Sequence, residues 1–135
     1  MSLGNELLPM PDNNPPEAAA LPVLIVDDEP HILDLLRAVL EDEGLTVITA
    51  SNGAAALYLI QRSPVALVLT DFMMPFVSGI DLARQLHSNP QTATVPLVLM
   101  SAVMPQQVSD IFAAVIHKPF DVDAIVRLVR QFLPE

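Results

Sequence analysis

The sequence contains no cysteine, and a single lysine, Lys118, stands among its 135 residues. Without cysteine the chain forms no disulfide and offers no thiolate for catalysis or metal binding. No apolar run approaches the roughly 20 residues that a membrane-spanning helix needs, and no signal-peptide pattern opens the chain. We therefore expect a protein of a reducing compartment, located in the cytoplasm and without membrane contact.

Positive charge is also scarce, and the charge that is present is uneven. The net charge is −10, and residues 1–50 carry ten acidic residues and one arginine. Because proteins bind nucleic acids mainly by neutralising phosphates with lysine and arginine, this balance disfavours direct nucleic-acid binding. Cations and basic partners remain compatible with it.

The length and composition indicate one compact domain preceded by a flexible arm. A chain of 135 residues that is 52% hydrophobic and 16% charged suits a single domain with a hydrophobic core. Residues 1–20 are rich in proline and asparagine and show no periodicity, which predicts a flexible arm. Residues 21–135 are expected to form the folded domain.

Beyond residue 20, short apolar runs alternate with amphipathic segments. The runs predict strands at 22–28, 45–50, 65–71, 95–102 and 113–119, and the amphipathic segments predict helices at 29–44, 53–62, 78–88, 105–112 and 121–133. Asn52, Ser78 and Asp121 stand at expected N-caps, and Pro30 suits a first helical turn. Since most strands are continuous apolar runs, we expect a parallel sheet covered by helices on both faces, an α/β fold with three layers.

Chemically active side chains follow four of the five predicted strands. Asp27 and Asp28 end the first strand, Asp71 the third, Ser101 the fourth and Lys118 the fifth. In open parallel sheets, ligands bind outside the carboxyl ends of the strands. These five side chains should therefore converge at one edge of the sheet.

This set of residues predicts a site for a phosphoryl group and a divalent cation. Three neighbouring carboxylates repel one another, and a hard cation such as Mg²⁺ relieves that repulsion. Lys118 supplies a positive charge for a phosphate oxygen, and Ser101 supplies a hydroxyl donor. Asp71 is then either a metal ligand only or also the nucleophile.

Simpler roles are available for each of these residues when they are considered one at a time. Asp27 and Asp28 could cap the helix that follows them, because acidic residues suit the positive end of a helix dipole. Asp71 could be a turn residue at a strand end, and the hydroxyl of Ser101 could cap a helix. Their combination with the single lysine favours the phosphoryl site.

Four short motifs carry a resemblance to a known family. VDDEP, LTDFMMP, VLMSA and HKPF occur in this order at the predicted strand ends. Together they resemble the receiver domain of bacterial two-component response regulators, in particular the chemotaxis-regulator-like members, over about residues 21–133. The resemblance implies a flavodoxin-like (βα)5 fold with strand order 2-1-3-4-5 and the role of a signalling switch rather than an enzyme.

The resemblance also implies a role for each carboxylate. Asp71 would accept a phosphoryl group from a histidine kinase or phosphotransfer protein and form an acyl phosphate. Asp28 and Asp71 would ligate Mg²⁺, Asp27 would hold it through water, and the backbone carbonyl of Met73 would complete the protein ligands.

The phosphoryl oxygens would have their own partners. By the same resemblance, Ser101 and Lys118 contact these oxygens, together with backbone N–H groups near Met73 and Ala102. The Lys118–Pro119 peptide bond would be cis, an isomer that proline makes accessible. The phosphorylated form would act on a downstream protein or on a fused output domain.

Two features depart from the family pattern. Val115 occupies the position, three residues before Lys118, where the family commonly has a tyrosine or phenylalanine that moves during switching. The segment between Ser101 and Lys118 is also short, which predicts a shortened fourth helix.

Two other functions are compatible with parts of the sequence. A degenerate receiver could act as an interaction module without phosphorylation, which Val115 and the short segment favour. A phosphatase like the haloacid dehalogenases also uses an aspartate after an apolar strand. That family needs a second aspartate two residues later, where this chain has Met73, and a cap domain for which the chain has no room.

Overall fold

The computed structural model describes residues 21–103 and 110–133 of the chain. This part of the chain contains five strands and four helices, in the order β1 (Val23–Val26), α2 (Pro30–Asp42), β2 (Val47–Ala50), α3 (Gly53–Arg62), β3 (Leu67–Asp71), α4 (Gly79–His87), β4 (Leu97–Ser101), β5 (Ala114–His117) and α5 (Val122–Phe132). All pairs of neighbouring strands are parallel, and the strand order is β2-β1-β3-β4-β5. The expected flavodoxin-like topology is confirmed.

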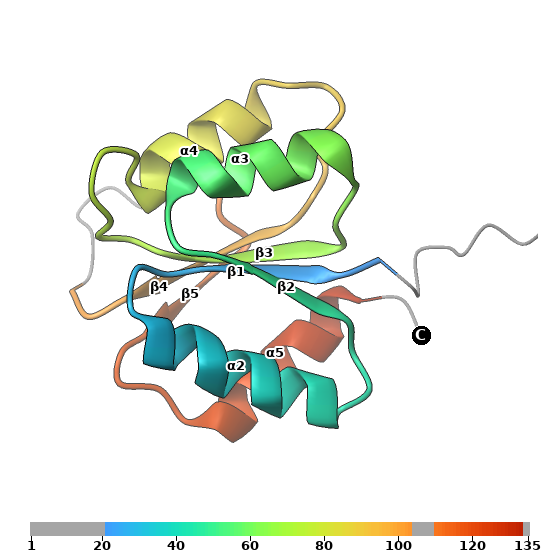
Figure 1. Ribbon diagram of the computed structural model, residues 1–135, viewed down its shortest axis with the longest axis vertical. Coiled ribbons are helices and arrows are strands. Elements are labelled where there is room, and N and C mark those ends of the chain that lie inside the picture. The colour runs from blue at the N-terminus through green and yellow to red at the C-terminus, as the bar shows by residue number, and fades with distance from the viewer. Residues whose placement is uncertain (1–20, 104–109, 134–135) are drawn as a thin grey trace, which may run out of the picture.

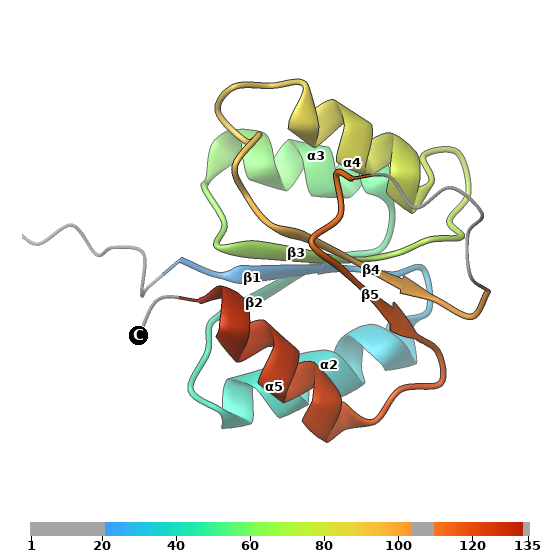
Figure 2. The ribbon, with the colours of Figure 1, turned by 180° about the vertical axis from the view of Figure 1, so that it is seen from behind.

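The sheet lies between two layers of helices. Figure 1 shows α3 and α4 on one face of the sheet and α2 and α5 on the other. Figure 2, the view from behind, shows β4 and β5 between the same two layers. The carboxyl ends of the strands face the left side of Figure 1, where the loops enter α2 and α4. No helix in the described part of the chain is long and apolar enough to cross a membrane.

Each face of the sheet has its own hydrophobic core, because successive strand residues point to opposite faces. Leu24 and Val68 pack with α3 and α4, whereas Ile25 and Leu69 pack with α2 and α5. Every residue of β1, β3 and β4 is buried. This burial explains the continuous apolar runs from which a two-sided sheet was predicted.

The predicted helix caps are present. The side chain of Asn52 accepts a hydrogen bond from the N–H of Ala55 at 2.8 Å. Ser78 forms a capping box at the start of α4, and Asp121 caps α5. Pro30 is the first residue of α2, as expected. These local signals fix where α3, α4 and α5 begin, and α4 and α5 follow the strands that end in Asp71 and precede Lys118.

Two predictions lie wholly or largely outside the described residues. The flexible arm at 1–20 is one of them. The shortened fourth helix, predicted at 105–112, is the other, since the structure describes only its end. There, Asp110 and Ile111 form a turn and Phe112 is not helical. Phe112 is 9% exposed and belongs to the core on the α3 and α4 face.

The loop between β3 and α4 contains a backbone conformation that the sequence does not indicate. Phe76 has a φ of 68° although it is not glycine, and its side chain is fully exposed. The N–H of Val77 donates to the carbonyl of Pro75 at 2.8 Å, which closes a γ-turn around Phe76. A γ-turn with positive φ is rare and strained for a residue that carries a Cβ atom.

We predict that Phe76→Asn stabilises the fold. Asparagine adopts positive φ values more readily than phenylalanine, and the exposed ring buries no surface that would be lost. The free energy of unfolding should rise by about 1 kcal/mol in urea titrations. Phe76→Ala is the matched control, since it removes the ring and keeps the Cβ atom. An equal gain in both variants would contradict the backbone explanation.

Candidate functional site

The alternation of side chains along the strands sorts the predicted site residues between the two faces of the sheet. Asp27 and Asp71 continue β1 and β3 in the positions that point toward α2 and α5, and Lys118 does the same after β5. Ser101 ends β4 in a position that points toward α3 and α4. The two carboxylates and the lysine therefore meet on one side, and the hydroxyl lies on the other.

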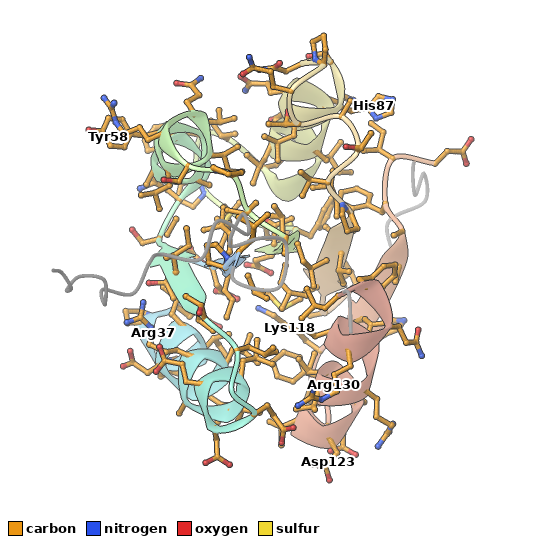
Figure 3. All side chains as sticks on the ribbon, turned by 90° about the vertical axis from the view of Figure 1, so that its right-hand side faces the viewer. Arg37, Tyr58, His87, Lys118, Asp123 and Arg130 are labelled. Atoms are coloured by element: carbon orange, nitrogen blue, oxygen red, sulfur yellow. The ribbon has the colours of Figure 1, made fainter. Side chains whose placement is uncertain are left out.

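Lys118 bridges the two buried carboxylates. Its Nζ atom lies 2.9 Å from Oδ2 of Asp27 and 3.1 Å from Oδ1 of Asp71. Figure 3 shows Lys118 near the centre of the molecule, while Arg37, Tyr58 and Asp123 lie at its periphery. Burial disfavours the charged ammonium, but the hydrogen bonds and charges of the two carboxylates outweigh it and raise the pKa of Lys118. Lys118 is thus held as a cation at the site.

Asp71 lies in a setting that disfavours its charged form. It is 7% exposed at the end of β3. Burial raises the pKa of Asp71, the charge of Asp27 adds to this effect, and the contact with Lys118 opposes it without cancelling it. The pKa of Asp71 is therefore raised mainly because its carboxyl group is buried, with a further contribution from Asp27.

The third carboxylate, Asp28, completes a cluster that fits a divalent cation. Oxygen atoms of Asp27, Asp28 and Asp71 all lie within 4.8 Å of one another, and Asp28 is exposed. Hard oxygen donors at this spacing suit Mg²⁺, which keeps several of its waters and takes few protein ligands. Three carboxylates beside the one ammonium group of Lys118 also leave negative charge that a cation would balance.

Asp27 also takes part in the start of α2. Its Oδ1 atom accepts a hydrogen bond from the N–H of Glu29 at 2.9 Å, while its Oδ2 atom binds Lys118. The N-cap residue is Glu29, whose side chain makes no capping hydrogen bond. Asp27 therefore stabilises the start of α2, as its simpler role predicted, and also belongs to the carboxylate cluster.

Ser101 forms hydrogen bonds within its own loop. Its Oγ atom accepts from the N–H of Val103 at 3.1 Å and donates to the carbonyl of Val103. Ala102 and Val103 are exposed. The structure therefore places Ser101 at the expected strand end, with its hydroxyl engaged in the loop that follows β4 rather than with Asp71.

Met73 follows Asp71 by two residues in the loop between β3 and α4. Its side chain is 67% exposed. Gly79, which was not among the predicted site residues, borders this loop with its backbone against the carbonyl of Asp71. The sequence shows that a glycine follows the Ser78 cap. Its distance along the chain from the strands does not indicate which strand end it contacts.

Residues 23–130 match the response regulator receiver domain family. The chain belongs to this family. It is 34% identical over 119 residues to an uncharacterized 14.6 kDa protein of Leptolyngbya boryana, with 84% of this chain and 91% of that protein covered. It is 32% identical over 124 residues to the response regulator Rre1 of Synechocystis, with 86% and 53% covered. The chain thus spans about half the length of Rre1.

Solved receiver domains have the same architecture. The chemotaxis protein CheY4 of Vibrio cholerae superposes with a TM-score of 0.79 at 22% identity, over 85% of this chain and 100% of that one. The response regulator TrrA of Thermotoga maritima, solved in complex with Mg²⁺ and a beryllium fluoride, superposes with a TM-score of 0.76 at 28% identity, over 84% and 99%. These likenesses confirm the receiver fold, and the acidic cluster of this chain is consistent with a phosphoacceptor aspartate and Mg²⁺ binding.

We predict that Asp71→Asn raises the stability of the fold at neutral pH when Mg²⁺ is removed with EDTA. The raised pKa means that the folded state binds a proton on Asp71 more tightly than the unfolded chain does. The contribution of this group to stability is therefore full at low pH and is lost as the pH rises through the folded-state pKa. Neutral asparagine avoids the loss.

Urea unfolding of both proteins at several pH values tests this expectation. The advantage of Asp71→Asn should shrink as the pH falls through the folded-state pKa of Asp71 and be absent below about pH 3.8, the ordinary pKa of the group, because both side chains are then neutral. Asp34→Asn, at an exposed position of α2, is the control and should show no such trend. A variant less stable than the wild type at pH 7 would contradict the account of Asp71.

Proposed function

We propose that this receiver domain accepts a phosphoryl group on Asp71 from a phosphohistidine of a histidine kinase or phosphotransfer protein, with Mg²⁺ bound beside it. The observation that carries the proposal is the cluster itself. Three carboxylates lie within reach of one cation, and the ammonium group of Lys118 lies 3.1 Å from Asp71. Phosphoryl transfer needs positioning and charge neutralisation above all, and these groups supply both.

The residues divide between the cation and the phosphoryl group. Asp28 and Asp71 would ligate Mg²⁺ directly, Asp27 would hold it through water, and the carbonyl of Met73 would be a further ligand. The bound cation would neutralise charge on the phosphoryl oxygens. The engagement of both Asp27 oxygens, with Glu29 and Lys118, supports a water-mediated role for this residue.

The chemistry at Asp71 is a substitution at phosphorus. A carboxylate oxygen of Asp71 attacks the phosphorus atom of the donor, the bond from phosphorus to the histidine nitrogen breaks, and that nitrogen takes up a proton. The product is an acyl phosphate on Asp71. Lys118, whose ammonium pKa is raised beside Asp27 and Asp71, would contact a phosphoryl oxygen as a cation, together with backbone N–H groups near Met73 and Ala102.

Switching would pass through Ser101. Its hydroxyl is bonded to the backbone of Val103, so a contact with a phosphoryl oxygen requires that it leave this loop. The exchange would couple the phosphoryl group to the shape of the segment after β4. Val115, partly buried against the core on the α3 and α4 face, takes the place of the usual aromatic residue, so the change in the loop would carry the signal without a moving ring.

The proposed function also includes the signalling role of the domain, its partners and its location in the cell. The protein would act as a signalling switch whose only chemistry is its own phosphorylation and dephosphorylation, and it would pass the signal to a partner protein or an output domain. Several relatives are named as transcriptional regulators, among them TcrX of Mycobacterium tuberculosis, of which this chain spans 49%. A cytoplasmic location follows from such a role. The charge of −10 supports contact with proteins rather than with nucleic acid.

Incubation with acetyl phosphate and Mg²⁺, followed by measurement of the intact mass, tests the proposed function. The wild-type protein should gain one phosphoryl group, because acetyl phosphate supplies the same group without a partner protein. Asp71→Asn and a sample in EDTA should gain none, and the control Asp34→Asn should behave as the wild type.

Two results would count against the proposal. Phosphorylation of Asp71→Asn would place the acceptor elsewhere in the chain. A folded wild-type protein that binds Mg²⁺ and gains no mass would favour the alternative of an interaction module that works without phosphorylation.

A further inference from the structure

The loop that joins β3 to α4 is confined at both ends by the first residues of two helices. It begins directly after Asp71 and contains Met73. Gly79, the first residue of α4, contacts the start of this loop, and Gly53, the first residue of α3, contacts its end at Val77. Both glycines are buried. The contacts are close enough that any side chain at either position would collide with the loop.

Gly79 lies against the backbone of the phosphoacceptor itself. A Cβ atom at this position would overlap the carbonyl oxygen of Asp71 and would come within 3.1 Å of the Asp71 carbonyl carbon and of Cα of Phe72. The N–H of Gly79 donates to the carbonyl of Phe72 at 3.0 Å, which fixes the approach. Since all of these atoms belong to the backbone, a side chain here could be accommodated only if β3 or α4 moved.

Gly53 confines the other end of the loop. A Cβ atom there would lie 2.6 Å from Cγ1 and 2.7 Å from Cβ of Val77, and 3.1 Å from its carbonyl oxygen. Valine is stiff about χ1, so its side chain cannot simply turn away. A larger residue at position 53 would therefore push on the backbone of Val77.

The part of the loop between these two contacts has a constrained backbone, so it cannot easily change conformation when either end is displaced. It contains the γ-turn in which Phe76 holds a φ of 68°. Strained conformations of this kind persist only where the surrounding structure determines them, and they cluster at functional sites. A displacement at either end would therefore reach the residues in between, Met73 among them.

We propose that Gly53 and Gly79 are positioning residues of the magnesium site, acting through the backbone of the loop from Asp71 to Val77. The inference rests on the proposed function, in which Asp71 and the carbonyl of Met73 bind the cation. Mg²⁺ demands nearly ideal octahedral geometry, so small shifts of two ligands on one loop lower its affinity. Substitutions of residues that orient metal ligands typically weaken binding about 10–100-fold.

Calorimetric titration with MgCl₂ tests the proposal without any phosphoryl donor. Gly79→Ala and Gly53→Ala should each raise the dissociation constant of Mg²⁺ by about 10–100-fold. Gly44→Ala is the matched control. Gly44 has a φ of +86° and nothing within 4 Å of an added Cβ atom, so alanine there strains the backbone outside the site. This control should lose stability and keep the wild-type affinity for Mg²⁺.

The stability of each variant is measured in parallel by urea unfolding in EDTA, and affinities are compared only for folded proteins. If Gly79→Ala does not fold, Gly53→Ala carries the test, because it meets one side chain and a single backbone oxygen. Wild-type affinity in the folded glycine variants, or an equal loss of affinity in Gly44→Ala, would overturn the positioning role. Failure of the wild-type protein itself to bind Mg²⁺ would instead overturn the proposed magnesium site, and the inference with it.

Discussion

The arrangement of the site depends on the repulsion among its carboxylates. Asp27 and Asp71 are both buried, Asp28 lies beside them, and among the residues that the structure describes Lys118 alone forms ion pairs with this cluster. Three carboxylates beside one ammonium group leave excess negative charge, and burial together with the charge of Asp27 raises the pKa of Asp71 above its ordinary value. A site with this imbalance favours whatever brings positive charge to it, and a divalent cation is the simplest candidate.

The fold produces this imbalance by geometry alone. Parallel strands deliver their carboxyl ends to one edge, and the alternation of side chains places Asp27, Asp71 and Lys118 on the same face of the sheet. Ser101 arrives on the opposite face, where its hydroxyl holds the loop after β4. Ser101 lies one position beyond Met100, the partner of Asp71 in the register of β3 and β4, which places the hydroxyl and the charged groups on opposite faces.

The sequence predicted a parallel sheet and the residues at its edge because the signals for them are local, whereas the strand order followed from the family resemblance. Apolar runs indicate buried strands, caps such as Ser78 mark helix starts, and each site residue follows a strand directly. Contacts between distant segments could not be predicted in the same way. The direct bond from Lys118 to Asp27, the approach of Gly79 to Asp71 and the left-handed backbone of Phe76 all depend on how the loops pack against one another. Packing of this kind does not produce a periodic pattern of residues in the sequence.

The central claim is that Asp71 and its neighbours form a magnesium-dependent phosphoryl site. The most direct test is a ¹⁹F NMR spectrum of the protein with beryllium fluoride, a compound that occupies the place of a phosphoryl group. With Mg²⁺ present, the account predicts new resonances of bound fluoride in the wild-type protein and their absence in Asp71→Asn or in EDTA. Bound resonances that persist in Asp71→Asn, or a wild-type spectrum that shows free fluoride alone in the presence of Mg²⁺, would contradict it.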